Sequence, residues 1–367
     1  MKTLIRLFGV LPLAVLLISV IGCDREITID GNAGEAEYVG SQTCGVCHED
    51  TYASFMKTGH PFKLNEASDA QQAGYYPYTT VASPPAGVSW SEVDKVIGGF
   101  WWKARFIDND GYIITGDDVQ YNFSNDTWTA YHSGETKPYD CGPCHMTGYQ
   151  DYGNQEGKEG LIGTWAFNGI QCEECHGRGS EHVAAPREVD MKIDHSSELC
   201  GKCHIRGDIG EIPASGGFTK HHEQWNEMYV TKHTTLKCVD CHDPHIGLHP
   251  DNPARADAIK IQCETCHFKE TESFMASTID HYDSQYGPDC IDCHMPYSSK
   301  SAVGNLATFT GDVRSHLWRI NIDASATMWN SDSTLSNGYL TVDYACLHCH
   351  TDESKSWAAG NADRIHP

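Results

Sequence analysis

Sixteen of the 17 cysteines belong to eight copies of one short motif. In each copy two residues separate the cysteines, and a histidine directly follows the second cysteine. Positions i, i+3 and i+4 share one face of a helical turn, so two thiols and one imidazole face the same way. The thiols can then bond the two vinyl groups of one porphyrin while the imidazole binds its iron. The motifs are Cys44/Cys47/His48, Cys141/Cys144/His145, Cys172/Cys175/His176, Cys200/Cys203/His204, Cys238/Cys241/His242, Cys263/Cys266/His267, Cys290/Cys293/His294 and Cys346/Cys349/His350.

Two other interpretations of paired cysteines fit less well. The segment from Cys141 to Cys144 has the Gly-Pro centre of a redox-active dithiol, in which one thiol has a lowered pKa at a helix start. His145 follows it, however, and the same pattern occurs seven more times. Structural zinc requires four protein ligands, whereas each motif supplies three. The sequence therefore predicts eight covalent c-type haems, each with the motif histidine as its proximal iron ligand.

A second axial ligand decides whether each iron only relays electrons or also binds a substrate. The chain has 21 histidines, enough for a second histidine at every iron. His348 lies inside the last motif, and His249 and His366 stand beside prolines, so we set these three aside. His221 and His222 are adjacent and should diverge, so we expect only one of the two to bind iron. Among the remaining histidines the candidates for the distal position include His132, His195, His222 and His281.

The first 22 residues have the pattern of an export signal. Lys2 and Arg6 precede an apolar run over residues 7–21, which is too short for a membrane span and contains Pro12. The run ends at Val-Ile-Gly-Cys, which resembles the bacterial lipobox, so Cys23 is the predicted site of lipidation and residues 23–37 a polar tether. The alternative is a plain secretory signal that leaves Cys23 as an unpaired thiol.

Charge and motif spacing restrict the class of protein. The chain has 26 basic and 50 acidic residues, a formal charge of −24, which excludes a protein that binds the nucleic-acid backbone. From His145 to His294 successive motif histidines are 25 to 38 residues apart. So little protein between cofactors implies that the porphyrins supply much of the core.

The same spacing predicts a mainly α fold with long loops, organised around eight covalent haems. We expect an N-terminal tetrahaem module over residues 38–205 and a C-terminal tetrahaem module over residues 206–367. A small β insert is predicted around residues 100–123, because residues 100–107, 112–115 and 119–123 are rich in aromatic and β-branched side chains and a turn follows the first of them. The insert could pack on a haem face or form an aromatic binding platform.

The N-terminal part resembles a known family. YVGSQTCGVCHEDTYASFMKTGH at residues 38–60, then CGPCHMTGY, GIQCEECHGRGSEH and LCGKCH, are similar to the tetrahaem core of the multihaem cytochromes that include the nitrifiers' tetrahaem carrier and hydroxylamine oxidoreductase. The resemblance covers residues 38–204 and implies stacked and perpendicular haem pairs, with His60 and His182 as distal ligands. Later segments resemble multihaem cytochromes generally, and on that basis we also expect His233, His245 and His316 to be distal ligands.

Two functions follow from this resemblance. The first is an electron carrier with only bis-histidine haems, which exchanges electrons with redox proteins of the envelope and a soluble or extracellular acceptor in anaerobic respiration. The second is an octahaem oxidoreductase with one open haem, which acts on nitrite, hydroxylamine or tetrathionate. The lysine-for-histidine variant that marks the active haem of octahaem nitrite reductases is absent, which favours the carrier. We expect lipid anchoring at the periplasmic face or the outer surface of a bacterial envelope, and a filament of stacked subunits is a further alternative.

Overall fold

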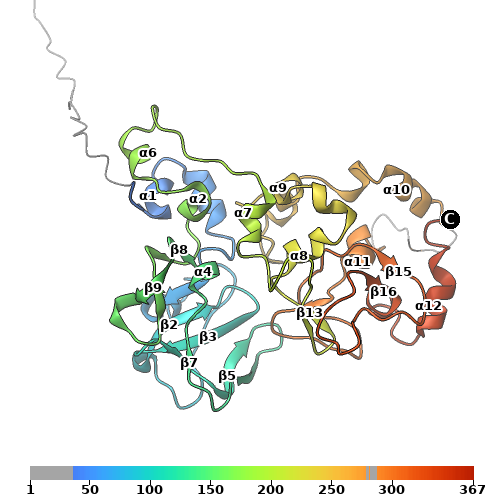
Figure 1. Ribbon diagram of the computed structural model, residues 1–367, viewed down its shortest axis with the longest axis horizontal. Helices are drawn as coiled ribbons and strands as arrows, with labels where there is room; N and C mark the ends of the chain where they lie inside the picture. Colours follow the sequence, from blue (N-terminus) through green and yellow to red (C-terminus); the bar gives the residue numbers. More distant parts are fainter. Residues whose placement is uncertain (1–35, 278–280, 282–286) are drawn as a thin grey trace, which may run out of the picture. The chain divides into compact units, whose positions relative to one another are not determined.

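The computed structural model describes residues 36–277, 281 and 287–367 (Figure 1). The predicted signal, tether and Cys23 lie almost wholly outside these residues. Residues 37–367 form one unit in the contact pattern, and the expected division into two modules at residue 205 stays a prediction. Within the described part of the chain, no helix has both the length and the apolar character that a bilayer crossing requires.

The helices of the described residues are short, and the longest of them have eight residues. Each motif forms or adjoins one helical turn, as its cysteine spacing predicts. The α-helices are α1 Ser41–Gly45, α2 Glu49–Phe55, α3 Ala67–Ala70, α4 Gly142–His145, α5 Cys172–His176, α6 Ser180–Ala184, α7 Ser197–Gly201, α8 Gln224–Tyr229, α9 Cys238–Cys241, α10 Phe268–Met275, α11 Cys290–His294 and α12 Lys355–Ala362. The sixth motif starts in a 3-10 turn, Cys263–Thr265, and the eighth in a π-turn, Asp343–Leu347.

The β insert is larger than the sequence predicts. Its seven strands are β1 Leu64–Glu66, β2 Val93–Gly98, β3 Lys103–Asp108, β4 Tyr112–Ile113, β5 Gly116–Asn122, β6 Thr127–Tyr131 and β7 Lys137–Pro138. They pair antiparallel in the order β1-β2-β3-β4-β7, and β5 joins β3 to β6. A sheet of this size, with further small sheets elsewhere, means that the expected mainly α class is not confirmed.

Both faces of this sheet are covered. Neighbouring strand residues point to opposite faces, and Val96 and Phe106 lie in one apolar cluster while Ile97 and Ile107 lie in another. The second cluster includes Tyr139 and Met146, which flank the second motif and are fully buried. The residues that flank the second motif therefore pack against one face of the sheet.

The other strands are short and tie loops together. They are β8 Met146–Thr147, β9 Gln150–Asn154, β10 Ile162–Thr164, β11 Phe167–Asn168, β12 Ala214–Ser215, β13 Phe218–Lys220, β14 Ser299–Lys300, β15 Ile320–Asn321 and β16 Leu340–Thr341. The parallel pairing of β13 with β14 sets Thr219 opposite Ser299. This pairing joins the segment before α8 to the loop after the seventh motif.

Candidate haem-binding sites

The motifs have the local geometry that covalent haem attachment requires. In five of them the backbone N–H of the histidine donates to the backbone carbonyl of the first cysteine at 2.9 to 3.0 Å, which closes one helical turn. None of the sixteen motif cysteines, all of which lie within the described residues, forms a disulfide. The two sulfurs and the imidazole of each motif are therefore available to one cofactor, as the sequence predicts.

Seven of the eight motif histidines face a second imidazole. An imidazole nitrogen binds a metal at roughly 2 Å, as in zinc sites, so an iron held between two nitrogens accommodates rings about 6 Å apart. The ring centroids lie 5.7 to 6.4 Å apart in the pairs His48 with His182, His176 with His245, His204 with His60, His242 with His316, His267 with His233, His294 with His366 and His350 with His281. This spacing fits bis-histidine iron.

Hydrogen bonds at Nδ1 fix the tautomer of several of these rings. A carbonyl oxygen can only accept, so an imidazole whose Nδ1 faces one carries its proton there and leaves the Nε2 lone pair for a metal. Nδ1 donates to a carbonyl or amide oxygen at 2.6 to 3.2 Å in His176, His182, His204, His294 and His366. His249 has the opposite tautomer, because its Nδ1 accepts a hydrogen bond from the backbone N–H of Asp251 at 3.2 Å and so carries no proton.

His145 of the second motif differs from the other seven. Within the described residues no imidazole ring has a centroid contact with it like those of the seven pairs, although His222 lies within electrostatic reach of His145, and its ring neighbour is the Tyr139 phenol at 6.3 Å. Its Nδ1 is buried without a hydrogen-bond partner. Burial, and then the charges of Lys63, Lys103 and Arg105, lower the pKa of His145 to about 3. The second motif therefore combines a neutral imidazole with nearby cations.

The β insert supplies these cations. Lys103 and Arg105 are two residues apart on β3 and so share one face of the strand, and Lys63 precedes β1. Lys103 Nζ donates to the Ser301 carbonyl at 2.6 Å, while the Arg105 guanidinium lies 3.7 Å from the Tyr131 ring centroid. Burial, then the Arg105 charge, lower the pKa of Lys103 to about 7. Sequence reasoning missed this group, although two cations within an apolar strand were a usable signal.

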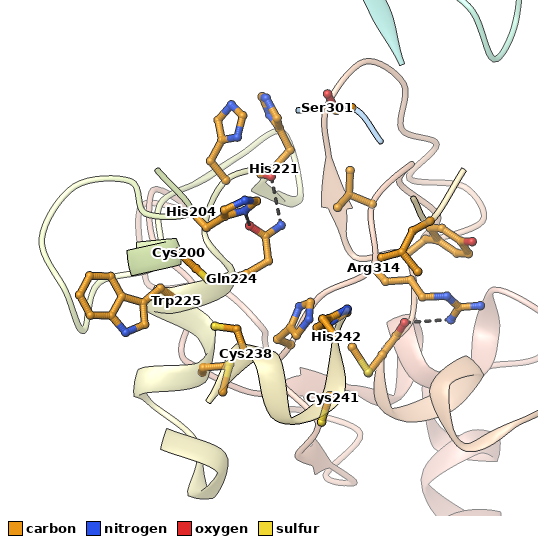
Figure 2. A pocket seen from close by; sticks show the side chains of 18 of the residues that line it. Cys200, His204, His221, Gln224, Trp225, Cys238, Cys241, His242, Ser301 and Arg314 are labelled. Atoms are coloured by element: carbon orange, nitrogen blue, oxygen red, sulfur yellow. Dashed lines mark hydrogen bonds between the residues drawn. The ribbon is translucent and has the colours of Figure 1, made fainter. Parts of the chain in front are cut away.

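A cavity of about 2560 Å³ connects most of the motifs. Cysteines of the second to the seventh motif line it, and so do Lys63, Lys103 and Arg105. Figure 2 shows part of it, where Cys200, His204, Cys238 and His242 lie close together. One continuous space bordered by six motifs fits several macrocycles placed side by side.

Cysteines of neighbouring motifs lie near one another. The nearest pairs are Cys44 with Cys172, Cys144 with Cys203, Cys200 with Cys238 and Cys263 with Cys290, and they place the first motif beside the third, the second beside the fourth, the fourth beside the fifth and the sixth beside the seventh. Cys175 is within electrostatic reach of Cys200 and Cys203, Cys241 of Cys266, and Cys293 of Cys346 and Cys349, which places the third motif near the fourth, the fifth near the sixth and the seventh near the eighth. The motifs thus form one series with a side branch.

The distal candidates from the sequence fall into two groups. His60, His182, His233, His245, His281 and His316 each face a motif histidine. His132 is exposed and bonded to Glu135 at 2.8 Å, His195 is exposed, and the His222 ring packs on His221 at 3.7 Å. Conversely, His366 faces His294, although its neighbour Pro367 led sequence reasoning to set it aside.

Comparisons with known proteins agree with this geometry. A family model described as cytochrome c554 and c-prime matches residues 118–177. The dissimilatory sulfite reductase MccA of Wolinella succinogenes is 20% identical over 204 residues, which cover 45% of this chain and 28% of that protein. The multiheme cytochrome MtrA of Shewanella baltica is 23% identical over 140 residues, 36% of this chain and 37% of that protein. The matches thus span about a third of these relatives.

Two solved structures share the fold. The outer cell wall cytochrome OcwA superposes with a TM-score of 0.60 over 89% of this chain and 86% of that chain, at 18% identity. The octaheme sulfite reductase MccA of Wolinella succinogenes superposes with a TM-score of 0.56 over 85% of this chain and 65% of that chain, at 15% identity. The protein is a multihaem c-type cytochrome.

Proposed function

We propose that this protein is an octahaem cytochrome that transfers electrons along a series of bis-histidine haems in the cell envelope. The observation that carries the proposal is the set of seven facing imidazole pairs with centroid distances of 5.7 to 6.4 Å. Two imidazole ligands leave no open position at iron and favour electron transfer over substrate chemistry. The proximity of cysteines from neighbouring motifs supports the order first, third, fourth, fifth, sixth, seventh, eighth, with the second motif branching from the fourth.

The environment of His145 favours a second activity at that branch. With no described imidazole opposite it, the iron of the second motif would keep an open coordination position, and haem iron there would supply electrons to a bound substrate. Lys63, Lys103 and Arg105 lie within electrostatic reach of His145. Fixed cations in an enclosed site stabilise negative charge far better than they do in water. We propose a small oxyanion of nitrogen or sulfur as the substrate class, in line with the sulfite reductase among the relatives.

Lys103 would have a further role in such a reaction. Its pKa of about 7 lets it carry a proton near neutral pH, which suits a group that both binds an anion and donates a proton to it. Arg105 keeps its charge at every relevant pH and would hold the anion when Lys103 is neutral.

The cellular setting completes the proposal. We propose that the chain is exported and anchored by lipid at Cys23, at the periplasmic face or the outer surface, where it serves anaerobic or extracellular respiration. A charge of −24 suits basic redox partners. Assembly into a filament stays an alternative, and a single particle size in native preparations at high concentration would argue against it.

Two measurements test the proposal. Intact mass spectrometry of the mature protein should give the mass of eight covalent haems, and a smaller number would overturn the octahaem assignment.

Nitrite titration of the holoprotein should shift the spectrum of one haem. Lys103→Met should weaken nitrite binding by roughly tenfold to a hundredfold, the range for a hydrogen bond to a charged group. Lys237→Met, in the same cavity but beside the fifth motif, is the control and should bind nitrite normally.

A further inference from the structure

Helix α8 contacts the axial histidines of two neighbouring haem sites. Gln224 Oε1 accepts a hydrogen bond from His204 Nδ1 at 3.0 Å. One turn later, Glu227 Oε2 accepts from the His316 backbone N–H at 2.7 Å and lies 3.8 Å from His316 Nδ1. His204 belongs to the fourth motif, and His316 faces His242 of the fifth. One short helix therefore presents an amide to one site and a carboxylate to the next.

Both side chains are held in place. Gln224 Nε2 donates to the His221 carbonyl at 3.1 Å, which fixes its amide with the oxygen toward His204 (Figure 2). Glu227 is 1% exposed, and its Oε1 accepts from Thr219 at 3.2 Å and from Ser299 at 3.4 Å. These donors keep the carboxylate in a fixed position.

The backbone of α8 is anchored as well. The fully buried Asn226 donates to three carbonyls at 2.8 to 3.1 Å. Trp225 packs so closely on Gly201 of α7 that a Cβ there would lie 1.9 Å from the indole. Since α7 contains Cys200, α8 is fixed directly to the fourth motif.

His316 is unusual among the facing histidines. Among the described residues its Nδ1 is buried and has no hydrogen-bond partner, and the Glu227 carboxylate lies 3.8 Å from it. His245 and His267 also have carboxylates within 3.8 Å of Nδ1, but their side chains are 40% and 52% exposed, against 17% for His316. Water screens the exposed pairs, whereas the pair with Glu227 lies in a low-dielectric interior.

The Glu227 carboxylate lies 3.8 Å from His316 Nδ1 without a hydrogen bond, so it acts on this site through its charge. Negative charge fixed near an iron stabilises the ferric state and lowers the reduction potential. A neutral amide, as at His204, has a weaker effect. The two sites served by α8 should therefore differ in potential.

We propose that α8 sets a potential step between the fourth and fifth haem sites, with Glu227 as the positioning residue that lowers the potential at the site of His242 and His316. The inference rests on the proposed function, because it requires iron at both pairs. The proposed step would also set the direction of electron flow, from the fifth site toward the fourth. Cys203 of the fourth motif lies beside Cys144 of the second, so electrons that settle on the fourth site would be next to the site of His145.

Reciprocal variants of the holoprotein test this step by spectropotentiometric titration with each haem resolved by EPR or NMR. Glu227→Gln should raise the potential of one haem, with about a tenfold change in its oxidised-to-reduced ratio at fixed potential, or about 59 mV for one electron. Gln224→Glu should lower the potential of a different haem. Glu211→Gln removes an exposed carboxylate nearby and should shift neither.

The outcomes separate the two proposals. If the variants carry their full haem content and low-spin signals but no single potential moves, the role of α8 is wrong and the proposed function stands. Too few haems, or two or more irons that are not low-spin in the unmodified protein, would overturn the proposed function itself. Should Glu227→Gln fail to fold, Gln224→Glu decides alone, because it places a charge at a site that is already hydrogen-bonded.

Discussion

The proton on Nδ1 separates His366 from His249, the two histidines that stand beside prolines. His366 donates from Nδ1 to the Glu270 carbonyl at 3.2 Å and faces His294. His249 accepts at Nδ1 and stacks on Tyr78 at 4.4 Å, which suits a packed aromatic neighbour better than a ligand. A proline beside a histidine, which is all that the sequence shows, does not distinguish these two cases.

His366→Ala should convert one low-spin iron to high-spin, because it removes the ligand that faces His294. EPR of the oxidised variant measures this change. His195→Ala is the matched control, since His195 is exposed and should leave the spectrum unaltered. Equal spectra for His366→Ala and the unmodified protein would contradict the assignment of His366.

Anion binding at the second motif should weaken as the pH rises. The pKa of Lys103 is lowered to about 7, so its charge is present below pH 7 and lost above it. Nitrite stays anionic over this range, and its affinity should therefore fall between pH 6 and 8 by roughly tenfold, about the effect of one lost charged contact. Titration at several pH values checks this, and Lys103→Met should remove the dependence.

At the scale of elements, the β insert is held by an ion cluster inside the sheet. Lys95 on β2 is fully buried, and its Nζ contacts Glu66 at 2.9 Å and Glu156 at 2.8 Å. Glu156 lies outside the sheet, so the cluster joins β1 and β2 to the loop before β10. The sheet that carries Lys103 and Arg105 on β3 is therefore stabilised by this ion cluster.

Lys95→Ala should destabilise the protein by about 2 kcal/mol, because it removes the buried cation that holds several carboxylates together, of which Glu66 and Glu156 are partly screened by water. Guanidinium unfolding followed by circular dichroism measures the loss. Lys192→Ala removes a salt bridge to Asp194 whose lysine side chain is 75% exposed, and it should cost at most about 1 kcal/mol. Equal losses in the two variants would show that the buried cluster has no special role.

Local patterns predict elements better than they predict the site. The helical turns of the motifs and the strands around residues 103–108 and 112–113 follow from short-range spacing. The edge strands β1, β6 and β7 do not, because their short segments are stabilised by pairing with distant strands. Lys63 and Lys103 are brought together by the pairing of β1, β2 and β3, and no local pattern contains that information.

At the scale of the whole molecule, the proximity of their cysteines orders the motifs into one series with a single branch at the fourth. The first and eighth motifs lie at the ends of the series, and Cys47 and Cys349 are exposed there. Electrons would thus enter or leave at either end and reach the second motif through the fourth. Within the described part of the chain, seven motif histidines face an imidazole and His145 at the branch does not, so the branch differs from the series in its candidate iron ligands.

The acidic surface should make electron exchange depend on salt. With a charge of −24, reduction of the cationic probe hexaammineruthenium should slow by roughly tenfold or more between 10 and 500 mM salt, because screening removes the attraction. Ferricyanide, an anionic control, should react faster as salt rises. Stopped-flow measurements that show the same trend for both probes would exclude electrostatic steering.

Low-temperature EPR of the oxidised holoprotein tests the central claim most directly. Seven facing pairs and the environment of His145 predict seven low-spin irons and one high-spin iron, and nitrite should change only the high-spin signal. Eight low-spin irons would show that His145 has a distal partner after all, with His222 the first candidate. Two or more high-spin irons would contradict the assignment of the facing pairs as iron ligands.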